Sequence, residues 1–147
     1  MENNIRFGKV ETTKSEVENA AKQAAVHNSI MNFSKGYQTV IGERGVSLSG
    51  GQKQRMSIAR ALIKQPKILL FDDSFSAVDT QTEETILNNL KSIPFQSTTI
   101  VVCHRISSAK NADQILVMDE GRVVQFGTHE VLVDEPGYYA ELCKKQL

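Results

Sequence analysis

The chain has 147 residues, 40% of them hydrophobic and 23% charged, which allows a globular domain with a core. Lysine plus arginine and aspartate plus glutamate number 17 each, so the charge gives no general reason to expect nucleic acid or a membrane surface as partner. The two cysteines, Cys103 and Cys143, are far apart, which favours a reducing compartment over a disulfide framework. No apolar run reaches the ~20 residues of a membrane helix, and no signal peptide is expected.

The first part of the chain is predicted to hold a short polar segment and two helices. Met1–Lys9 shows no hydrophobic period. Ser15 and Glu18 have the S-x-x-E spacing of a capping box, which predicts a helix start. A second short helix is expected over Ser29–Phe33, so His27 is interpreted as a surface or helix-end residue rather than a ligand. The apolar face of the first helix would consist of Val17, Ala20, Ala21, Ala24 and Ala25.

The stretch Leu48–Gln52, Leu-Ser-Gly-Gly-Gln, predicts a helix start that suits an anion. Ser49 and Gln52 have the spacing of a capping box, in which the side chain of each residue accepts a hydrogen bond from the backbone N–H of the other. Gly50 and Gly51 carry no side chains, so an anion can approach the free N–H groups at the positive end of the helix dipole.

The helix that begins there is expected to run to about Lys64, because Pro66 stops it. Its apolar face would consist of Met56, Ala59, Leu62 and Ile63. Ile68–Phe71 then predicts a fully buried parallel strand. Asp72 and Asp73 follow at the carboxyl end of that strand, where open α/β sheets place their ligands, and such a pair suits magnesium and phosphate chemistry.

A second strand and the helix before it complete a βαβ unit. Thr80 and Glu83 have the T-x-x-E spacing of a capping box, with Asp79 just before it. The apolar stripe of this helix would consist of Ile86, Leu87, Leu90 and Ile93. Thr98–Cys103 predicts another central parallel strand, joined to the first by a right-handed crossover. His104 would then lie at the same sheet edge as the two aspartates.

The last third of the chain is predicted to be a hairpin followed by two helices. Gln114–Met118 and Arg122–Phe126 flank the tight turn Asp119–Gly121. A short helix is expected from a cap at Thr128 through Val133, and Pro136-Gly137 would end it. Tyr138–Gln146 closes the chain as a polar-faced helix.

These segments resemble, in their order, the motifs of the ATP-binding cassette family. Leu48–Gln52 resembles its LSGGQ signature, and Ile68–Asp72 resembles its Walker B strand. Ser76–Asp79 is similar to its D-loop, and His104 stands where the family carries its switch histidine. Thr39–Gly45 resembles the loop of export-type members that lies beside the coupling helices of the transmembrane partner.

The resemblance implies an α/β fold, a partial P-loop NTPase: a helical signature subdomain over residues 1–66, then the parallel-sheet core, hairpin and helices of the second half of the ATPase core over 67–147. The phosphate-binding motif G-x-x-x-x-G-K-[ST] is absent, since the one Gly-Lys pair, Gly8-Lys9, has no glycine five residues before it. In the family, the strand before that loop lies between those that resemble Thr98–Cys103 and Gln114–Met118. We therefore expect a fragment with open strand edges.

The family pattern implies ATP and Mg²⁺ as cofactors. Asp72 would hold magnesium through water, His104 would contact the γ-phosphate, and Asp73 would stand at the position of the catalytic base. That base is usually Glu, and Asp is shorter by roughly 1.5 Å, as in the weak subunits of heterodimeric exporters. Ser49, Gly50 and Gly51 would bind the γ-phosphate of ATP held by the opposite protomer. The full set of cofactor-binding residues that the resemblance implies is Leu48, Ser49, Gly50, Gly51, Gln52 and Asp79.

Three functions stay open at this point. The first is the ATPase domain of an exporter at the cytoplasmic face of the cell membrane. It would pair head to tail with a second nucleotide-binding domain, in a heterodimer, and contact a transmembrane domain through Thr39–Gly45. The second is an inert cassette fragment that acts only by association. The third is a soluble cassette protein of DNA repair or translation, against which the Gly42–Gly45 loop and the lack of basic arms argue, so no nucleic acid partner is expected.

Overall fold

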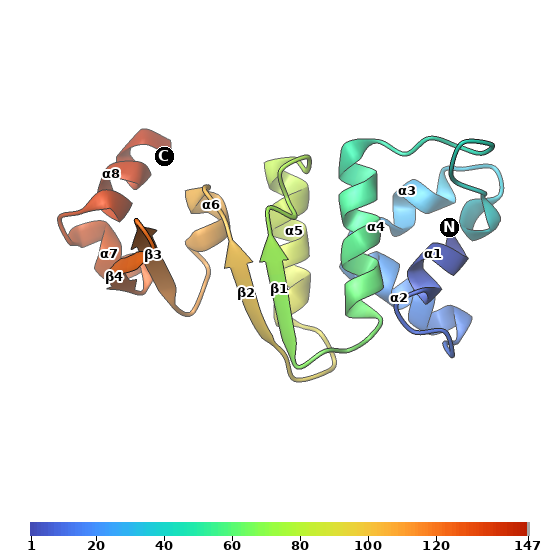
Figure 1. Cartoon of the computed structure of the whole chain (residues 1–147), viewed down its shortest axis with the longest axis horizontal. Helices are drawn as coiled ribbons and strands as arrows, with labels where there is room; N and C mark the ends of the chain where they lie inside the picture. The colour runs from blue at the N-terminus through green and yellow to red at the C-terminus, as the bar shows by residue number, and fades with distance from the viewer. Residues whose placement is uncertain (147) are drawn as a thin grey trace. The chain divides into compact units, whose positions relative to one another are not determined.

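The computed structural model describes residues 1–146, and they form two compact units that divide between Val102 and Cys103 (Figure 1). The first unit holds six helices and a pair of strands; the second holds a hairpin and three short helices. The boundary predicted between residues 66 and 67 refers to subdomains of the complete family fold and stays a prediction. Leu147, the last residue of the predicted second region, lies outside the described residues.

The helical part of the first unit is built around one long helix. Its core lies where α2 packs against α4, and the buried residues of the two helices include Val17, Ala20, Met56 and Leu62. Sequence patterning predicted both apolar faces, and their burial confirms it. The elements are α1 (Glu2–Arg6), α2 (Lys14–Gln23), α3 (His27–Met31), the 3-10 helix η1 (Gly36–Gln38) and α4 (Gly50–Leu62).

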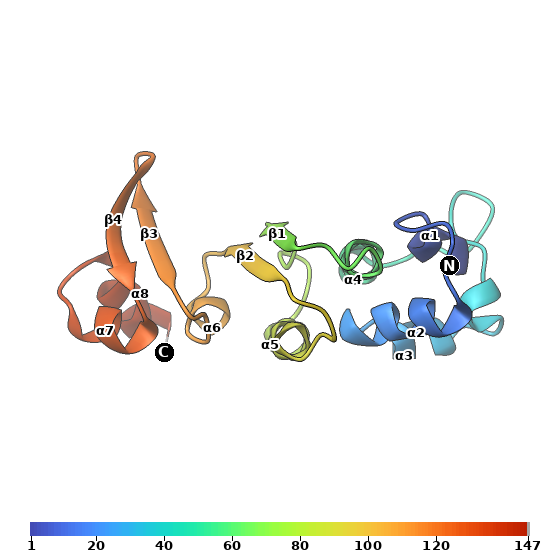
Figure 2. The same cartoon turned by 90° about the horizontal axis from the view of Figure 1, so that it is seen from below.

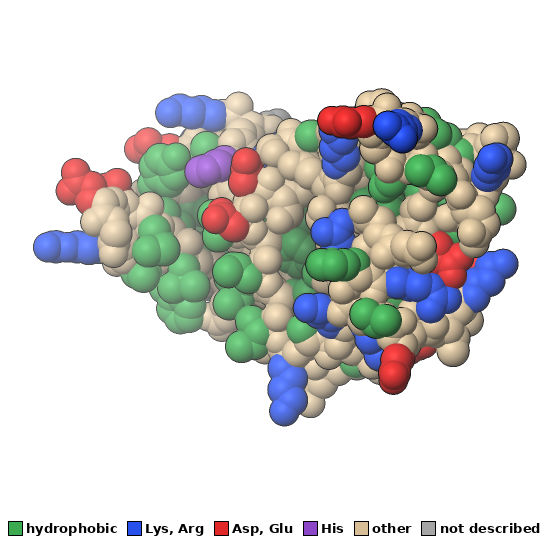
Figure 3. Space-filling model, turned by 45° about the vertical axis from the view of Figure 1, so that its right-hand side comes forward, with side chains coloured by type: hydrophobic (Ala, Val, Ile, Leu, Met, Phe, Trp, Pro, Cys, Tyr) green, Lys and Arg blue, Asp and Glu red, His purple; other side chains and the backbone are tan. Residues whose placement is uncertain are grey.

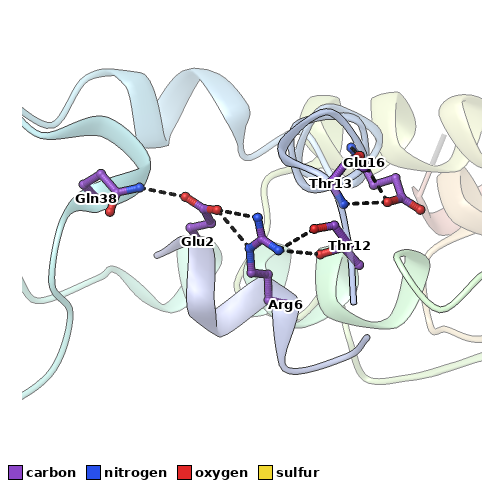
Figure 4. A network of polar contacts seen from close by, with 6 residues as sticks. All are labelled: Glu2, Arg6, Thr12, Thr13, Glu16 and Gln38. Atoms are coloured by element: carbon purple, nitrogen blue, oxygen red, sulfur yellow. Dashed lines mark hydrogen bonds and ion pairs between the residues drawn. The ribbon is translucent and has the colours of Figure 1, made fainter. Parts of the chain in front are cut away.

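No helix was predicted within the polar, unpatterned segment Met1–Lys9, but α1 occupies its first part. Ile5 is fully buried in the core, and Arg6 forms an ion pair with Glu2 at 2.7 Å, one turn earlier on the helix. Arg6 also donates to the backbone and side chain of Thr12, which leads into α2 (Figure 4). A single buried apolar residue gives too little periodicity to be recognised in the sequence.

The helix start predicted at Ser15 is also displaced, since α2 begins after Thr13. Thr13 and Glu16 form the reciprocal capping box: Glu16 N–H donates to Thr13 Oγ1 at 3.2 Å, and Thr13 N–H donates to Glu16 Oε2 at 2.7 Å (Figure 4). The bond from the Thr13 backbone, followed by that from Lys9, lowers the pKa of Glu16 to about 2. Two overlapping segments share the capping spacing, and the earlier one gains the extra contact with Lys9 at 3.0 Å. The next helix, α3, likewise starts two residues before the predicted Ser29.

The strands of the first unit form the predicted parallel βαβ arrangement. β1 (Ile68–Asp72) pairs parallel with β2 (Thr98–Val102), and α5 (Thr80–Lys91) connects them. Leu70 lies opposite Ile100 and Asp72 opposite Val102, so the acidic end of β1 and the exit of β2 share one edge. The buried residues Ile86 and Leu90 of α5 confirm its predicted apolar stripe.

The prediction of fully buried strands is wrong for both of them. Leu69 and Phe71 are each 3% exposed, whereas Ile68 and Leu70 are each 64% exposed. Figure 2 shows α5 on one face of the strand pair, and no described element of the first unit covers the other. Hydrophobic side chains accordingly reach the surface (Figure 3). We define the open sheet face as Ile68, Leu70, Ile100 and Val102.

The second unit follows the predicted order of hairpin and helices. Glu120 and Gly121 both have positive φ, 45° and 75°, as the tight turn of an antiparallel hairpin requires. Its core consists of Ile106, Ile115, Val117, Leu132, Tyr139 and Cys143. The elements are α6 (Ile106–Ala109), which was not predicted, β3 (Ile115–Asp119), β4 (Arg122–Gly127), α7 (His129–Asp134) and α8 (Tyr138–Gln146). Within residues 1–146, no helix has the length and apolar character needed to cross a membrane.

The displaced helix start gives a first test. Thr13→Ala should lower the free energy of unfolding by about 1 kcal/mol, because it removes the oxygen that accepts from Glu16 N–H. Ser15→Ala, at an exposed position of the same turn, should change it by less than about 0.5 kcal/mol. Urea unfolding of both variants measures the difference.

The pH dependence provides the control. The pKa of Glu16 is lowered from 4.5 to about 2 in the folded chain, so its stabilising contribution is complete above pH 4.5 and is lost as the pH falls toward 2. Thr13→Ala keeps the backbone bond to Glu16 and loses the bond that Thr13 Oγ1–H donates to Oε2 at 3.1 Å. The difference between the unmodified chain and Thr13→Ala should therefore shrink slightly over that range. A larger effect of Ser15→Ala than of Thr13→Ala would restore the original prediction.

The open sheet face predicts self-association. Replacing Leu70 and Ile100 together by Thr keeps strand-forming residues but removes exposed apolar surface, so the weight-average mass should fall toward that of one chain. Sedimentation velocity measures it. Val10→Thr, at an apolar residue that is 79% exposed but lies outside the sheet, serves as the control and should have no effect. A monodisperse monomer for the unmodified chain would contradict this expectation.

Candidate nucleotide-binding site

The start of α4 has the geometry that the sequence predicted. Gln52 N–H donates to Ser49 Oγ at 3.2 Å, and Ser49 N–H donates to Gln52 Oε1 at 2.9 Å, which confirms the capping box. Gly50 and Gly51 are the first two residues of the helix, and within residues 1–146 no partner accepts from their N–H groups. Ser49 and Gly50 are exposed. The helix start therefore has two N–H groups without a partner among the described residues, one at the exposed Gly50 and one at the half-buried Gly51.

The same helix start packs closely on the segment that follows β1. A Cβ atom added at Gly51 would lie 2.7 Å from the backbone oxygen of Ala77, a distance that real Cβ contacts do not reach. A Cβ atom at Gly50 would lie 3.3 Å from the Ala77 side chain. Sequence reasoning explained both glycines by the approach of an anion. The structure adds, for Gly51, a requirement that arises within the chain itself.

Polar bonds join α4 to the same segment. Gln54 Nε2 donates to Ser76 Oγ at 2.8 Å, and Ala77 N–H donates to Gln54 Oε1 at 2.9 Å. Asp73 has φ of 49°, in the left-handed region that a non-glycine residue rarely adopts. Sequence reasoning missed Gln54, whose place two residues after the capping Gln52 gave no signal of its own.

The two aspartates lie at the carboxyl end of β1, as predicted. Asp72 is the last residue of the strand and Asp73 follows it, and both are exposed. Among the described residues, no group of three or more His, Cys, Asp or Glu side chains could enclose a metal ion. A single carboxylate fits Mg²⁺ where water and phosphate oxygens supply the remaining ligands. Asp72 is suited to that arrangement, and its role stays a prediction.

Asp79 caps α5, and the capping box predicted for Thr80 and Glu83 is wrong. Asp79 Oδ1 accepts from Thr82 N–H at 2.9 Å, so Thr80 becomes the first helical residue instead of the cap. Aspartate is at least as good an N-cap as threonine, and Asp79 comes one residue before Thr80. Hydrogen bonding with Thr82 lowers the pKa of Asp79. Its predicted contact with a nucleotide stays a prediction.

His104 lies in the second unit, two residues beyond β2, and its side chain is exposed. Its backbone oxygen accepts from Gln146 Nε2 at 3.0 Å, which fixes the chain at this point to α8. The strand that leads to His104 pairs with β1 as expected. The meeting of His104 with the two aspartates stays a prediction.

The Thr39–Gly45 loop borders a hollow of about 640 Å³, which sequence reasoning did not foresee. Thr39, at the start of the loop, is buried, whereas Val40 is 68% exposed and residues 42–45 are exposed. Gln38 Nε2 donates to Glu2 Oε2 at 2.7 Å, which ties the loop to α1 (Figure 4). The other lining residues include Phe7, 78% exposed, with the Arg60 guanidinium 5.9 Å from its ring centre. Two exposed apolar side chains and an arginine thus surround an open hollow.

These features define an α/β protein that contains part of a P-loop NTPase fold, with a glycine-rich helix start beside the acidic end of a parallel strand. A sequence profile described as ABC transporter matches residues 2–76, just over half of the chain. The chain therefore belongs to the ABC transporter family, and its sequence corresponds to the signature-containing part of the nucleotide-binding domain.

Proteins of known name support this assignment. The chain is 50% identical over 144 residues to ATP-binding cassette sub-family B member 6 of Xenopus tropicalis, covering 98% of this chain and 17% of that protein. It is 48% identical over 143 residues to ABC transporter B family member 24, mitochondrial, of Arabidopsis thaliana, covering 97% of this chain and 21% of that protein. A bacterial Atm1-family ABC exporter solved with ATP bound is 45% identical and superposes with a TM-score of 0.86, covering 97% of this chain and 25% of the exporter chain. The chain thus spans about a fifth of the length of these curated relatives.

The close approach at Gly51 can be tested directly. Gly51→Ala should lower the free energy of unfolding by about 1–3 kcal/mol, because the added carbon meets the Ala77 backbone oxygen. Gly50→Ala is the matched control: its contact is looser, and alanine favours the helix, so the change should stay within about 1 kcal/mol. Urea unfolding measures both. Equal effects would show that the contact with Ala77 does not restrict Gly51.

Proposed function

We propose that this chain is part of the ATPase of an exporter, and that its Leu48–Gln52 segment contacts ATP held by the phosphate loop of a second nucleotide-binding domain. The two domains would pair head to tail. The observation that carries the proposal is the exposed start of α4, with two unpartnered N–H groups and no side chain beyond the backbone at Gly50 and Gly51.

The charge around the helix starts supports an anion as ligand. Of the three described helices with ten or more residues, α2 has Glu16 in its first turn and α5 has Glu83, together with the Asp79 cap. Only α4 has no acidic residue in its first turn. Its positive end is therefore not neutralised by the chain, and a phosphate group would supply the missing negative charge.

The chain's own acidic edge would serve a different ATP molecule. Asp72 would hold Mg²⁺ there through a water ligand, and the ion would neutralise charge on the phosphate groups. Asp73 would hold the attacking water, although its carboxylate is one methylene shorter than the usual glutamate of the family. His104 would contact the γ-phosphate. Since the sequence has no phosphate-loop motif, we expect weak ATP binding and no turnover by the chain alone.

A transmembrane partner would dock at the Thr39–Gly45 loop. The hollow beside this loop offers the exposed Phe7 and Val40 side chains to an apolar residue and Arg60 to a carboxylate or carbonyl group. Such a partner would hold the chain at a membrane. The cytoplasmic face of the cell membrane stays a prediction, since the Arabidopsis relative is named mitochondrial.

Purely associative action is the second candidate, and the open sheet face favours it. Its four apolar residues give the chain a surface that can bind other cassette domains without ATP. The two candidates differ in one measurable property, which is whether association depends on nucleotide.

A charge substitution at the helix start separates the two candidates. The chain is mixed with a cassette domain that has an intact phosphate loop and no catalytic base, and association is followed by sedimentation in MgATP and in MgADP. Gly50→Asp should weaken the ATP-dependent association tenfold or more, because its carboxylate would repel the γ-phosphate. Gly50→Asn has nearly the same shape without the charge and should retain most of the association.

The stability of the two variants is the control. Aspartate in the first turn favours a helix, so Gly50→Asp should unfold at the same urea concentration as Gly50→Asn or a higher one. If the unmodified chain associates equally well with and without ATP, the associative candidate replaces the proposal.

A further inference from the structure

Within residues 1–146, the side-chain hydrogen bonds of Gln54 all join it to one segment, the turn between β1 and α5. Its Nε2 donates to Ser76 Oγ at 2.8 Å and to the backbone oxygen of Asp73 at 3.4 Å, and its Oε1 accepts from Ala77 N–H at 2.9 Å. Both ends of the amide are therefore used. A primary amide can replace a backbone partner in this way because it offers donors and an acceptor in one plane.

These bonds hold a backbone shape that is unfavourable by itself. Asp73 has φ of 49°, in the left-handed region that is unfavourable for a residue with a Cβ. Its backbone oxygen accepts from Ser76 Oγ at 3.2 Å as well as from Gln54, so the turn is fixed from two sides. The position of the Asp73 carboxylate thus depends on a side chain of α4.

The first turn of α4 meets the same turn at a second point. Gly51 packs against the backbone oxygen of Ala77, and Ala77 N–H donates to Gln54, one turn further along the helix. A displacement of the helix start would therefore be passed to Ala77 through two contacts, of which only Gln54 forms directional bonds.

We propose that Gln54 is a positioning residue that couples the helix start at Gly50–Gly51 to the Asp73–Ala77 turn. The proposal rests on the proposed function, in which these two segments contact two different ATP molecules. A nucleotide bound at the helix start would then change the mobility of the turn that carries Asp73. Gln54 itself contacts neither nucleotide.

Three variants test the coupling. Gln54→Met keeps the length of the side chain but removes all three bonds, and Gln54→Glu keeps an acceptor for Ala77 N–H while it removes both donated bonds. Lys53→Met is the matched control, because its exposed side chain lies beside Gln54 on the same helix and forms no side-chain bond within residues 1–146. Amide hydrogen exchange at single-residue resolution is the readout.

The first measurement uses the chain alone. The Ala77 amide should exchange about five-fold faster in Gln54→Met, remain nearly as slow in Gln54→Glu, and be unchanged in Lys53→Met. Amides of the α4 core, such as Ala59, should exchange at the same rate in all variants, which excludes general unfolding. An unchanged Ala77 rate in Gln54→Met would overturn the proposal.

The second measurement adds MgATP and the partner cassette domain described above. In the unmodified chain, exchange should slow at Gly50–Gly51 and also at Ala77, whereas in Gln54→Met it should slow at Gly50–Gly51 alone. Slowing at Ala77 in both would show that the Gly51 packing transmits the change, and would overturn the role of Gln54. If ATP slows neither site in the unmodified chain, the proposed function fails together with the coupling, while the first measurement still decides whether Gln54 holds the turn.

Discussion

The close packing of Gly51 on the Ala77 backbone is the constraint on which the candidate site depends. It places the start of α4 against the turn after β1, so that a glycine-rich helix start and an acidic strand end belong to one rigid neighbourhood. The distance leaves no room for a side chain at Gly51, and the bonds of Gln54 join the same two segments one helical turn further on. Packing within the chain thus requires a glycine at Gly51, whereas the contact at Gly50 is looser, and for Gly50 we propose the approach of an anion as the reason.

Local spacing predicted helix starts well where only one candidate cap was present, and poorly where two overlapped. Ser49 and Gln52 had no competitor and form the expected box. At Thr13 and Ser15 two residues had the same spacing to a glutamate, and the choice between them depends on a contact with Lys9, which the sequence pattern does not contain. At α5 the aspartate before the predicted threonine took the cap. Such shifts of one or two residues leave the apolar faces intact, because the core fixes the helix more strongly than its cap does.

The burial of the strands could not be predicted in the same way. A continuous apolar run indicates that both faces of a strand can be buried, but it does not show which elements bury them. Leu69 and Phe71 are buried against the core of the first unit, while their neighbours Ile68 and Leu70 form the open sheet face. The order of the motifs along the chain, in contrast, is a property of the sequence itself. For this reason the family was recognisable before any geometry was known, and the roles of Gln54 and of the hollow beside Thr39 were not.

The starts of α4 and α5 differ in charge, and this difference determines which of the two is suited to bind an anion. The turn from Asp73 to Asp79 leads from β1 into α5 and packs against the start of α4. At α5 the Asp79 carboxylate already accepts from Thr82 N–H, and hydrogen bonding with Thr82 lowers the pKa of Asp79. An anion gains little there, because a negative charge is present. At α4 the cap is a neutral serine and the first turn has no acid, so the same dipole remains available. The turn from Asp73 to Asp79 therefore lies next to two helix starts of opposite character. The start of α5 already has a negative charge, so of these two helices α4 is the one whose start is suited to a phosphate group.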